Sequence, residues 1–128
     1  MSEQRILVVE DYRPLLAGLR DILEAEGYVV STATNGAQAL QMMKEACPDL
    51  IVADIMMPTM DGYALFEAVR ARSEWAPIPV VFLTSKAEKD DLLKGKNMGV
   101  EGYIIKPFEP ETLLATVRAL LERARATR

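Results

Sequence analysis

The chain has 128 residues and a net charge of −4, and hydrophobic residues make up 50% of it. This length and composition indicate one globular domain with a sizeable core, and they favour neither disorder nor broad electrostatic binding of nucleic acid. The absence of histidine excludes Ser-His-Asp catalysis, histidine-ligated zinc and a phosphohistidine on this chain. Cys47 is the single cysteine, and no apolar stretch approaches the roughly 18 residues of a membrane span, so we expect a cytoplasmic protein.

Short apolar runs alternate with longer amphipathic segments along the chain. The first run, residues 6–9, precedes a helical stripe of leucine and isoleucine that ends at Gly27, a residue typical of the C-terminal cap of a helix. The second run, residues 28–33, precedes a helix predicted over residues 37–46. Both segments therefore read as a strand followed by a helix.

The second half of the chain continues the alternation. A run at residues 50–53 precedes a predicted helix at 62–72, and a run at 80–83 precedes a predicted helix at 86–98. The helix at 86–98 is rich in lysine and poor in large apolar residues, so we expect it to pack weakly. The last run, residues 102–105, precedes a final helix with a leucine stripe. The whole pattern predicts an α/β fold with a parallel sheet covered by helices on both faces.

Polar side chains follow the apolar runs at four points. Glu10 and Asp11 follow the first run, Asp54 the third, Thr84 the fourth and Lys106 the fifth. The carboxyl ends of parallel strands meet at one edge of the sheet, and ligands of such sheets bind there. We therefore expect these five side chains to share one crevice.

Three carboxylates in one crevice repel one another unless a cation or protonation offsets their charge. At about 4 to 6 Å and an effective dielectric constant of about 20, each pair costs roughly 3 to 4 kcal/mol. Lys106 offsets part of this repulsion. Mg²⁺ suits the remainder, with Mn²⁺ as the alternative ion, because it combines carboxylates with waters and a phosphate oxygen. The residues thus favour phosphoryl transfer, with Asp54 as the nucleophile and Lys106 and Thr84 holding phosphoryl oxygens.

The sequence resembles the receiver domain of two-component response regulators, and in particular the chemotaxis regulators, over nearly its whole length. The resemblance implies a flavodoxin-like, doubly wound sheet of five parallel strands in the order 2-1-3-4-5 with five helices. It rests on the acidic pair Glu10-Asp11, the segment at residues 54–62, the pair Thr84-Ser85 and the segment at residues 103–108.

The resemblance also implies a function for individual residues. Asp54 is expected to be the phosphoacceptor, with Thr84 and Lys106 acting on the phosphoryl group. Glu10, Asp11, Asp54 and the backbone carbonyl of Met56 are expected to bind Mg²⁺. The resemblance further implies that Thr84 and Tyr103 are switch residues, and that the bond between Lys106 and Pro107 is cis.

The resemblance predicts the partners as well. The phosphodonor is expected to be a sensor histidine kinase or a phosphotransfer protein. The face formed by the fourth helix, the fifth strand and the fifth helix is expected to change partners, binding a downstream effector, an output domain outside this sequence or a second copy of the chain. We expect a switch that assists its own phosphoryl transfer rather than an enzyme, with no membrane partner and no direct contact with nucleic acid. Residues 1–128 are expected to form the receiver, with residues 122–128 as the start of a linker or tail.

Several alternatives remain at the level of sequence. Asp54 could cap a turn, Asp11 could cap the first helix, Tyr103 could be an ordinary half-buried strand residue and Lys106 could be a solvated lysine. A Mg²⁺-dependent phosphatase with an aspartate nucleophile, or a constitutive docking module, are the alternative functions. Such phosphatases carry an Asp-x-Asp pattern on the first strand. Asp54 instead follows the third apolar run, and the residue two positions later is not an acid.

Overall fold

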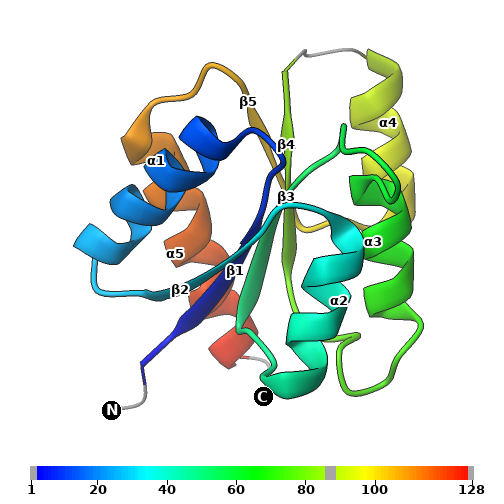
Figure 1. Cartoon of the computed structure of the whole chain (residues 1–128), viewed down its shortest axis with the longest axis horizontal. Coiled ribbons are helices and arrows are strands. Elements are labelled where there is room, and N and C mark those ends of the chain that lie inside the picture. Colours follow the sequence, from blue (N-terminus) through cyan, green and yellow to red (C-terminus); the bar gives the residue numbers. More distant parts are fainter. Residues whose placement is uncertain (1–2, 86–88, 127–128) are drawn as a thin grey trace.

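A computed structural model describes residues 3–85 and 89–126 (Figure 1). Strands and helices alternate as the sequence predicts, and the bounds agree with the predicted ones to within a residue or two where both are described. The start of the predicted fourth helix, residues 86–88, lies outside the described residues. The elements are β1 (Arg5–Val9), α1 (Arg13–Ala25), β2 (Val29–Ala33), α2 (Gly36–Glu45), β3 (Leu50–Asp54), α3 (Gly62–Arg70), β4 (Val80–Thr84), α4 (Lys89–Met98), β5 (Gly102–Ile105) and α5 (Pro110–Ala126).

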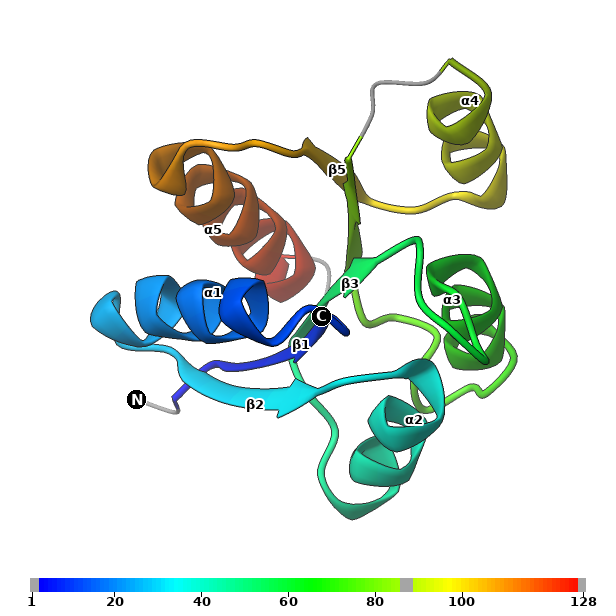
Figure 2. The same ribbon diagram turned by 45° about the horizontal axis from the view of Figure 1, so that its top comes forward.

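The five strands form one parallel sheet in the order β2-β1-β3-β4-β5. Helices α1 and α5 cover one face of the sheet, and α2, α3 and α4 cover the other (Figures 1 and 2). The predicted flavodoxin-like, doubly wound architecture is therefore confirmed. This order places β1 beside β3 at the centre of the sheet, so that residues distant in sequence meet at the carboxyl ends of the strands.

The core has two halves, one on each face of the sheet. Successive side chains of a strand point to opposite faces, so Ile6 and Val8 join the half beneath α1 and α5, whereas Leu7 and Val9 join the other. All five residues of β3 and of β4 are buried. Burial on both faces explains why these strands read as continuous apolar runs.

The ends of the helices have local causes. The Asn35 side chain accepts a hydrogen bond of 2.8 Å from the backbone N–H of Gln38 and so caps α2. Gly27, with φ of 96°, follows the end of α1, as predicted. The proposed cap of α1 by Asp11 is wrong, because Tyr12 occupies the N-cap position and no side chain caps this helix end.

Helix α4 has few large apolar residues to anchor it. The side chain of Leu93 is 53% exposed, whereas Met98, at the end of the helix, packs against the core. The side chain of Leu92, the other leucine of this helix, is not among those described. Among the described helices, none combines the length and the apolar character that a membrane span requires.

Candidate functional site

Three carboxylates lie together at the carboxyl edge of the sheet, where the sequence predicts them. Glu10, Asp11 and Asp54 each offer a carboxylate oxygen within 4.8 Å of the others. The strand register explains this proximity. Val9 of β1 pairs with Ala53 of β3, and Glu10 and Asp54 are the residues that directly follow this pair. The structure therefore brings together the three acids that the sequence placed in one crevice.

The three carboxylates differ in their contact with solvent. Glu10 is 1% exposed and Asp54 is 5% exposed, whereas Asp11 is exposed. A buried carboxylate is stable only with a partner, a metal or a proton. The two buried acids thus need partners from the protein, and Asp11 lies where an ion from solvent can reach it.

Lys106 is the partner of both buried acids. Its Nζ donates to Oδ2 of Asp54 at 2.7 Å and to Oε1 of Glu10 at 3.0 Å. The backbone N–H of Lys106 donates to the carbonyl of Thr84 at 2.7 Å, and its bond to Pro107 is cis, as predicted. The interpretation of Lys106 as a solvated lysine is wrong, since its side chain is 20% exposed and bridges two carboxylates.

Backbone N–H groups hold the remaining carboxylate oxygens. The N–H of Met56 donates to Oδ1 of Asp54 at 3.0 Å, and the N–H of Tyr12 donates to Oε2 of Glu10 at 3.1 Å. Asp54 therefore does cap its own turn, as the alternative interpretation held, while its other oxygen faces Lys106. Because each buried carboxylate is held at both oxygens, its orientation is fixed.

The surroundings shift two pKa values. Burial raises the pKa of Glu10 from 4.5 to about 7, and the hydrogen bonds from Tyr12 and Lys106, which lower it, only partly offset this effect. Burial lowers the pKa of Lys106, but its hydrogen bonds to Asp54 and Glu10 outweigh burial and raise it above 10.5. Lys106 therefore stays protonated, while Glu10 is partly protonated near neutral pH.

The two predicted switch residues lie on neighbouring strands. Thr84 is buried at the end of β4 and pairs in register with Ile105 of β5. Tyr103 on β5 is half-buried, and its ring lies 5.9 Å from that of Phe82. This burial agrees with the alternative interpretation, in which Tyr103 is an ordinary half-buried residue of a strand. The switching role of Tyr103 stays a prediction.

The loop after Asp54 is held by a close backbone contact that the sequence did not reveal. A Cβ atom on Gly62 would lie 2.7 Å from the carbonyl oxygen of Asp54 and 2.8 Å from Cα of Ile55. The N–H of Gly62 donates to the Ile55 carbonyl at 2.9 Å. Asp61 and Gly62, at the start of α3, are residue types that favour a turn, but the approach of Gly62 to Asp54 depends on how the loop folds back.

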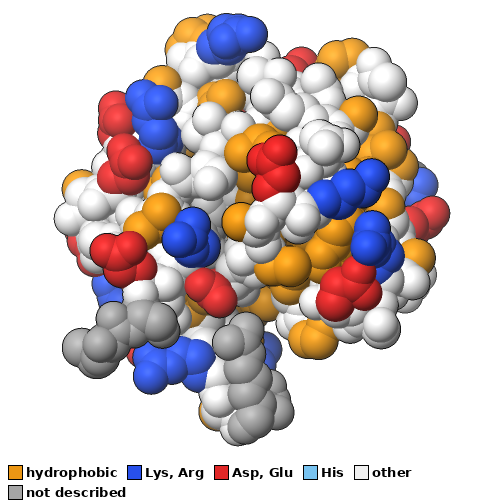
Figure 3. All heavy atoms as spheres, turned by 60° about the horizontal axis from the view of Figure 1, so that its bottom comes forward, with side chains coloured by type: hydrophobic (Ala, Val, Ile, Leu, Met, Phe, Trp, Pro, Cys, Tyr) orange, Lys and Arg blue, Asp and Glu red, His pale blue; other side chains and the backbone are white. Residues whose placement is uncertain are grey.

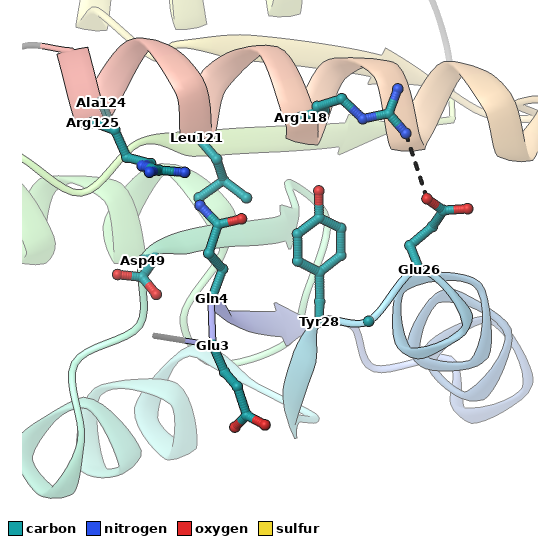
Figure 4. Close-up of a pocket in the computed structure, with 10 residues that line it drawn as sticks. Glu3, Gln4, Glu26, Tyr28, Asp49, Arg118, Leu121, Ala124 and Arg125 are labelled. Atoms are coloured by element: carbon teal, nitrogen blue, oxygen red, sulfur yellow. Dashed lines mark hydrogen bonds and ion pairs between the residues drawn. The ribbon is translucent and has the colours of Figure 1, made fainter. Parts of the chain in front are cut away.

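A cavity of about 610 Å³ lies at the opposite edge of the sheet and contains none of the candidate residues. Tyr28, Arg118 and Glu26 contribute to its wall, and Nη2 of Arg118 lies 3.4 Å from Oε2 of Glu26 (Figure 4). Acidic and basic side chains are interspersed on the face of the molecule that includes this edge (Figure 3). This face therefore carries no broad patch of one charge.

The chain belongs to the response regulator receiver domains, whose family matches residues 6–118. It is 42% identical over 127 residues to the transcriptional regulatory protein PrrA of Mycobacterium leprae, covering 99% of this chain and 54% of that protein. It is 41% identical over 120 residues to the DNA-binding response regulator MtrA of the same organism, covering 94% of this chain and 52% of that protein. The chain thus spans about half the length of the curated relatives it matches.

Solved structures agree with this assignment. The chemotaxis response regulator CheY4 of Vibrio cholerae matches with a TM-score of 0.87 and 34% identity, over 93% of this chain and 99% of that one. A CheY-like receiver domain protein of Methanospirillum hungatei matches with a TM-score of 0.91 and 28% identity, over 99% and 100% of the two chains. The predicted resemblance is confirmed: the chain is a receiver domain, a signalling switch of two-component systems rather than a conventional enzyme. Such domains bind Mg²⁺, and the acidic cluster is consistent with a phosphoacceptor site.

Proposed function

We propose that Asp54 accepts a phosphoryl group from a sensor histidine kinase or a phosphotransfer protein, in a reaction that requires a divalent cation. One observation supports this most strongly. The Asp54 carboxylate has two further acids with oxygens within 4.8 Å and an ammonium nitrogen at 2.7 Å. This combination suits a nucleophile whose target carries several negative oxygens.

The proposed step conserves atoms and charge. A carboxylate oxygen of Asp54 forms a bond to phosphorus while the bond from phosphorus to the donor's histidine nitrogen breaks. The electron pair of that bond stays on the imidazole, which takes up a proton from solvent. Lys106 turns its ammonium toward a phosphoryl oxygen, and the hydroxyl of Thr84 donates to another. These two donors stabilise the charge of the transferring group.

The acidic residues fit a hard cation. Glu10, Asp11 and Asp54 would hold Mg²⁺ or Mn²⁺ together with the backbone carbonyl of Met56, because carboxylate and carbonyl oxygens are the ligands these ions prefer. The bound ion would supply positive charge beside the transferring phosphoryl group. Asp11, the exposed member of the cluster, would be the first ligand that an ion from solvent meets.

The output of the switch is proposed to be a change in the face formed by α4, β5 and α5, through Thr84 and Tyr103. That face would bind a downstream effector, an output domain or a second copy of the chain. The relatives named as a transcriptional regulator and a DNA-binding regulator favour control of transcription by the whole protein, while residues 1–128 act as the receiver and residues 122–128 lead into a linker or tail. We propose that the phosphoryl transfer to Asp54 takes place in the cytoplasm, which agrees with the free thiol of Cys47.

Phosphorylation by a small phosphodonor tests the proposal directly. The wild type and Asp54→Asn would be incubated with acetyl phosphate, with and without Mg²⁺, and weighed by intact mass spectrometry. The expected result is a single phosphoryl adduct on the wild type that needs Mg²⁺ and is absent from Asp54→Asn. Asp21→Asn, at an exposed position on α1, is the matched control and should be modified like the wild type.

Two outcomes would contradict the proposal. An adduct of equal size on Asp54→Asn would place the acceptor at another residue. The absence of an adduct under every condition would contradict phosphorylation of this chain. Repeated turnover of a phosphomonoester such as p-nitrophenyl phosphate would instead support the aspartate-nucleophile phosphatase.

A further inference from the structure

Phe82 lies at the centre of a cluster of aromatic rings between the sheet and α3. Its side chain is fully buried, and it pairs in register with Tyr103 across β4 and β5. Its ring lies 5.5 Å from that of Tyr63, 5.8 Å from that of Phe66 and 5.9 Å from that of Tyr103, each in an edge contact. A single ring therefore contacts both the strand that carries Tyr103 and the helix that carries Tyr63.

Helix α4 reaches the same cluster through a lysine. The Nζ atom of Lys94 lies 4.2 Å from the centre of the Tyr63 ring, which is the geometry of a cation–π contact. Helices α3 and α4 lie next to each other on this face of the sheet (Figures 1 and 2). Leu93, the neighbour of Lys94, is 53% exposed, so among the described side chains of α4 the attachments are the ring contact of Lys94 and the packing of Met98 against the core.

The ring contacts make Tyr103 and α4 interdependent. Edge contacts between rings have a preferred geometry, and a fully buried ring cannot turn without displacing its neighbours. A change in the position of Tyr103 would therefore alter the packing of Phe82 and, through it, the Tyr63 ring on which Lys94 rests. The cation–π contact between Lys94 and Tyr63 would then strengthen or weaken as the Tyr63 ring moves.

We infer that Tyr63, Phe82 and Lys94 couple Tyr103 on β5 to the position of α4. In the unphosphorylated protein Lys94 holds α4 against α3, and displacement of Tyr103 releases it. The extension of this coupling to the phosphorylated protein rests on the proposed function, whereas the coupling between Tyr103 and α4 in the resting protein does not.

Hydrogen exchange of the α4 amides measures the proposed attachment. Lys94→Met keeps the apolar stem and removes the charge, and it should speed exchange in α4 by roughly two- to fivefold, as expected for loss of an exposed cation–π contact. Tyr63→Leu should have a similar effect, whereas Tyr63→Phe keeps an aromatic face and should exchange like the wild type. Lys96→Met, at an exposed position in the last turn of the same helix, is the control and should leave exchange unchanged.

Combination with Tyr103→Leu tests the coupling itself. Alone, Tyr103→Leu should speed exchange in α4, and in the Lys94→Met background it should add little, because the contact through which it acts is already lost. Full additivity of the two changes, or equal effects of Lys94→Met and Lys96→Met, would overturn the inference. A thermal unfolding scan of each variant separates a local effect on α4 from general loss of the fold.

The phosphorylated state gives a separate comparison. Acetyl phosphate with Mg²⁺ should speed α4 exchange in the wild type and change it less in Lys94→Met, with the phosphoryl content of both samples read by intact mass. An equal response at equal phosphoryl content would contradict the extension to the phosphorylated protein. A missing adduct would count against the proposed function alone, since the resting-state comparison stands without it.

Discussion

Nζ of Lys106 lies 2.7 Å from Oδ2 of Asp54, although 52 residues separate the two in sequence. The same nitrogen lies 3.0 Å from Oε1 of Glu10. Both acids are buried, and loss of one member of a buried ion pair leaves an uncompensated charge. Among the described residues, the ammonium of Lys106 is what balances the charges of Asp54 and Glu10.

Replacement of Lys106 should destabilise the metal-free protein. We expect Lys106→Met to lower the free energy of unfolding by roughly 1.5 to 3 kcal/mol at pH 8, the range for hydrogen bonds to charged groups. Mg²⁺ should raise the stability of the variant more than that of the wild type, because a cation replaces the lost ammonium. Urea denaturation with and without Mg²⁺ measures both effects. Lys44→Met, at an exposed position of α2, is the control, and an equal loss in the two variants would refute the role of Lys106.

The raised pKa of Glu10 predicts a dependence of stability on pH. Between pH 4.5, its ordinary pKa, and about 7, the folded protein holds a proton that the unfolded chain releases. Stability should therefore fall as the pH rises through this range, by up to about 1.4 kcal/mol per pH unit from this group. Urea denaturation from pH 4.5 to 8, in the presence of a chelator, should show this slope in the wild type.

Glu10→Gln isolates the contribution of this carboxyl group. The variant should lose the component of the slope that belongs to Glu10, so that its stability relative to the wild type rises toward pH 8. Glu24→Gln, which removes an exposed carboxylate on α1, should keep the slope of the wild type. Parallel curves for the wild type and Glu10→Gln would show that Glu10 titrates normally.

The backbone contact of Gly62 predicts opposite results for two glycine substitutions. Gly62→Ala should destabilise by about 1 to 3 kcal/mol, because its Cβ would meet backbone atoms of Asp54 and Ile55 that have no room to move. Gly18→Ala, inside α1 with no heavy atom beyond the neighbouring backbone of its own helix within 4 Å of the added Cβ, should stabilise by up to about 1 kcal/mol. Thermal or urea denaturation distinguishes them, and equal changes would refute the contact.

Thr59 adopts a backbone conformation that suits glycine better. Its φ of 70° lies in the left-handed region, where a β-branched residue is strained. We expect Thr59→Gly to raise the free energy of unfolding by up to about 1 kcal/mol, the strain released exceeding the added freedom of the unfolded chain. Thr59→Val keeps the branched Cβ and should gain nothing in the same urea denaturation. A gain in Thr59→Val as large as in Thr59→Gly would exclude relief of backbone strain.

Replacement of Asp11 should reduce the affinity for Mg²⁺ without reducing the stability of the metal-free protein. Asp11→Asn should unfold at nearly the wild-type temperature in a chelator, because its side chain is exposed. In a titration with Mg²⁺, the wild type should gain thermal stability while the variant gains much less at the same concentrations. Asp21→Asn should respond like the wild type. A full response of Asp11→Asn to Mg²⁺ would remove Asp11 from the ligand set.

The fold and the edge of the sheet that carries the site could be predicted because both follow from regular patterns. Apolar runs of strand length alternate with helical stripes, and parallel strands bring their carboxyl ends together, so Asp54 and Lys106 could be assigned to one crevice. The identity of the cap of α1 could not be predicted. Asp11 and Tyr12 both precede the helix, and Tyr12 takes the N-cap position. Its backbone N–H donates to the Glu10 carboxylate.

Other contacts depend on distances that the sequence does not contain. The bridge from Lys106 to both Glu10 and Asp54 requires the relative position of β1, β3 and β5, and the approach of Gly62 to Asp54 requires the path of a loop. The ring cluster around Phe82 likewise joins residues from α3, β4 and β5. Each side chain could be assigned to a buried face, but its neighbours across elements could not.

The bond between Lys106 and Glu10 joins residues 96 positions apart, which has a consequence for the order of events during synthesis. Glu10 and Asp11, which follow β1, and Asp54, at the end of β3, are made long before the lysine that follows β5 leaves the ribosome. Until β5 joins the sheet, an emerging chain has its carboxylates without their ammonium partner. In the proposed function, Asp54 should therefore become able to accept a phosphoryl group only when β5 has joined the sheet.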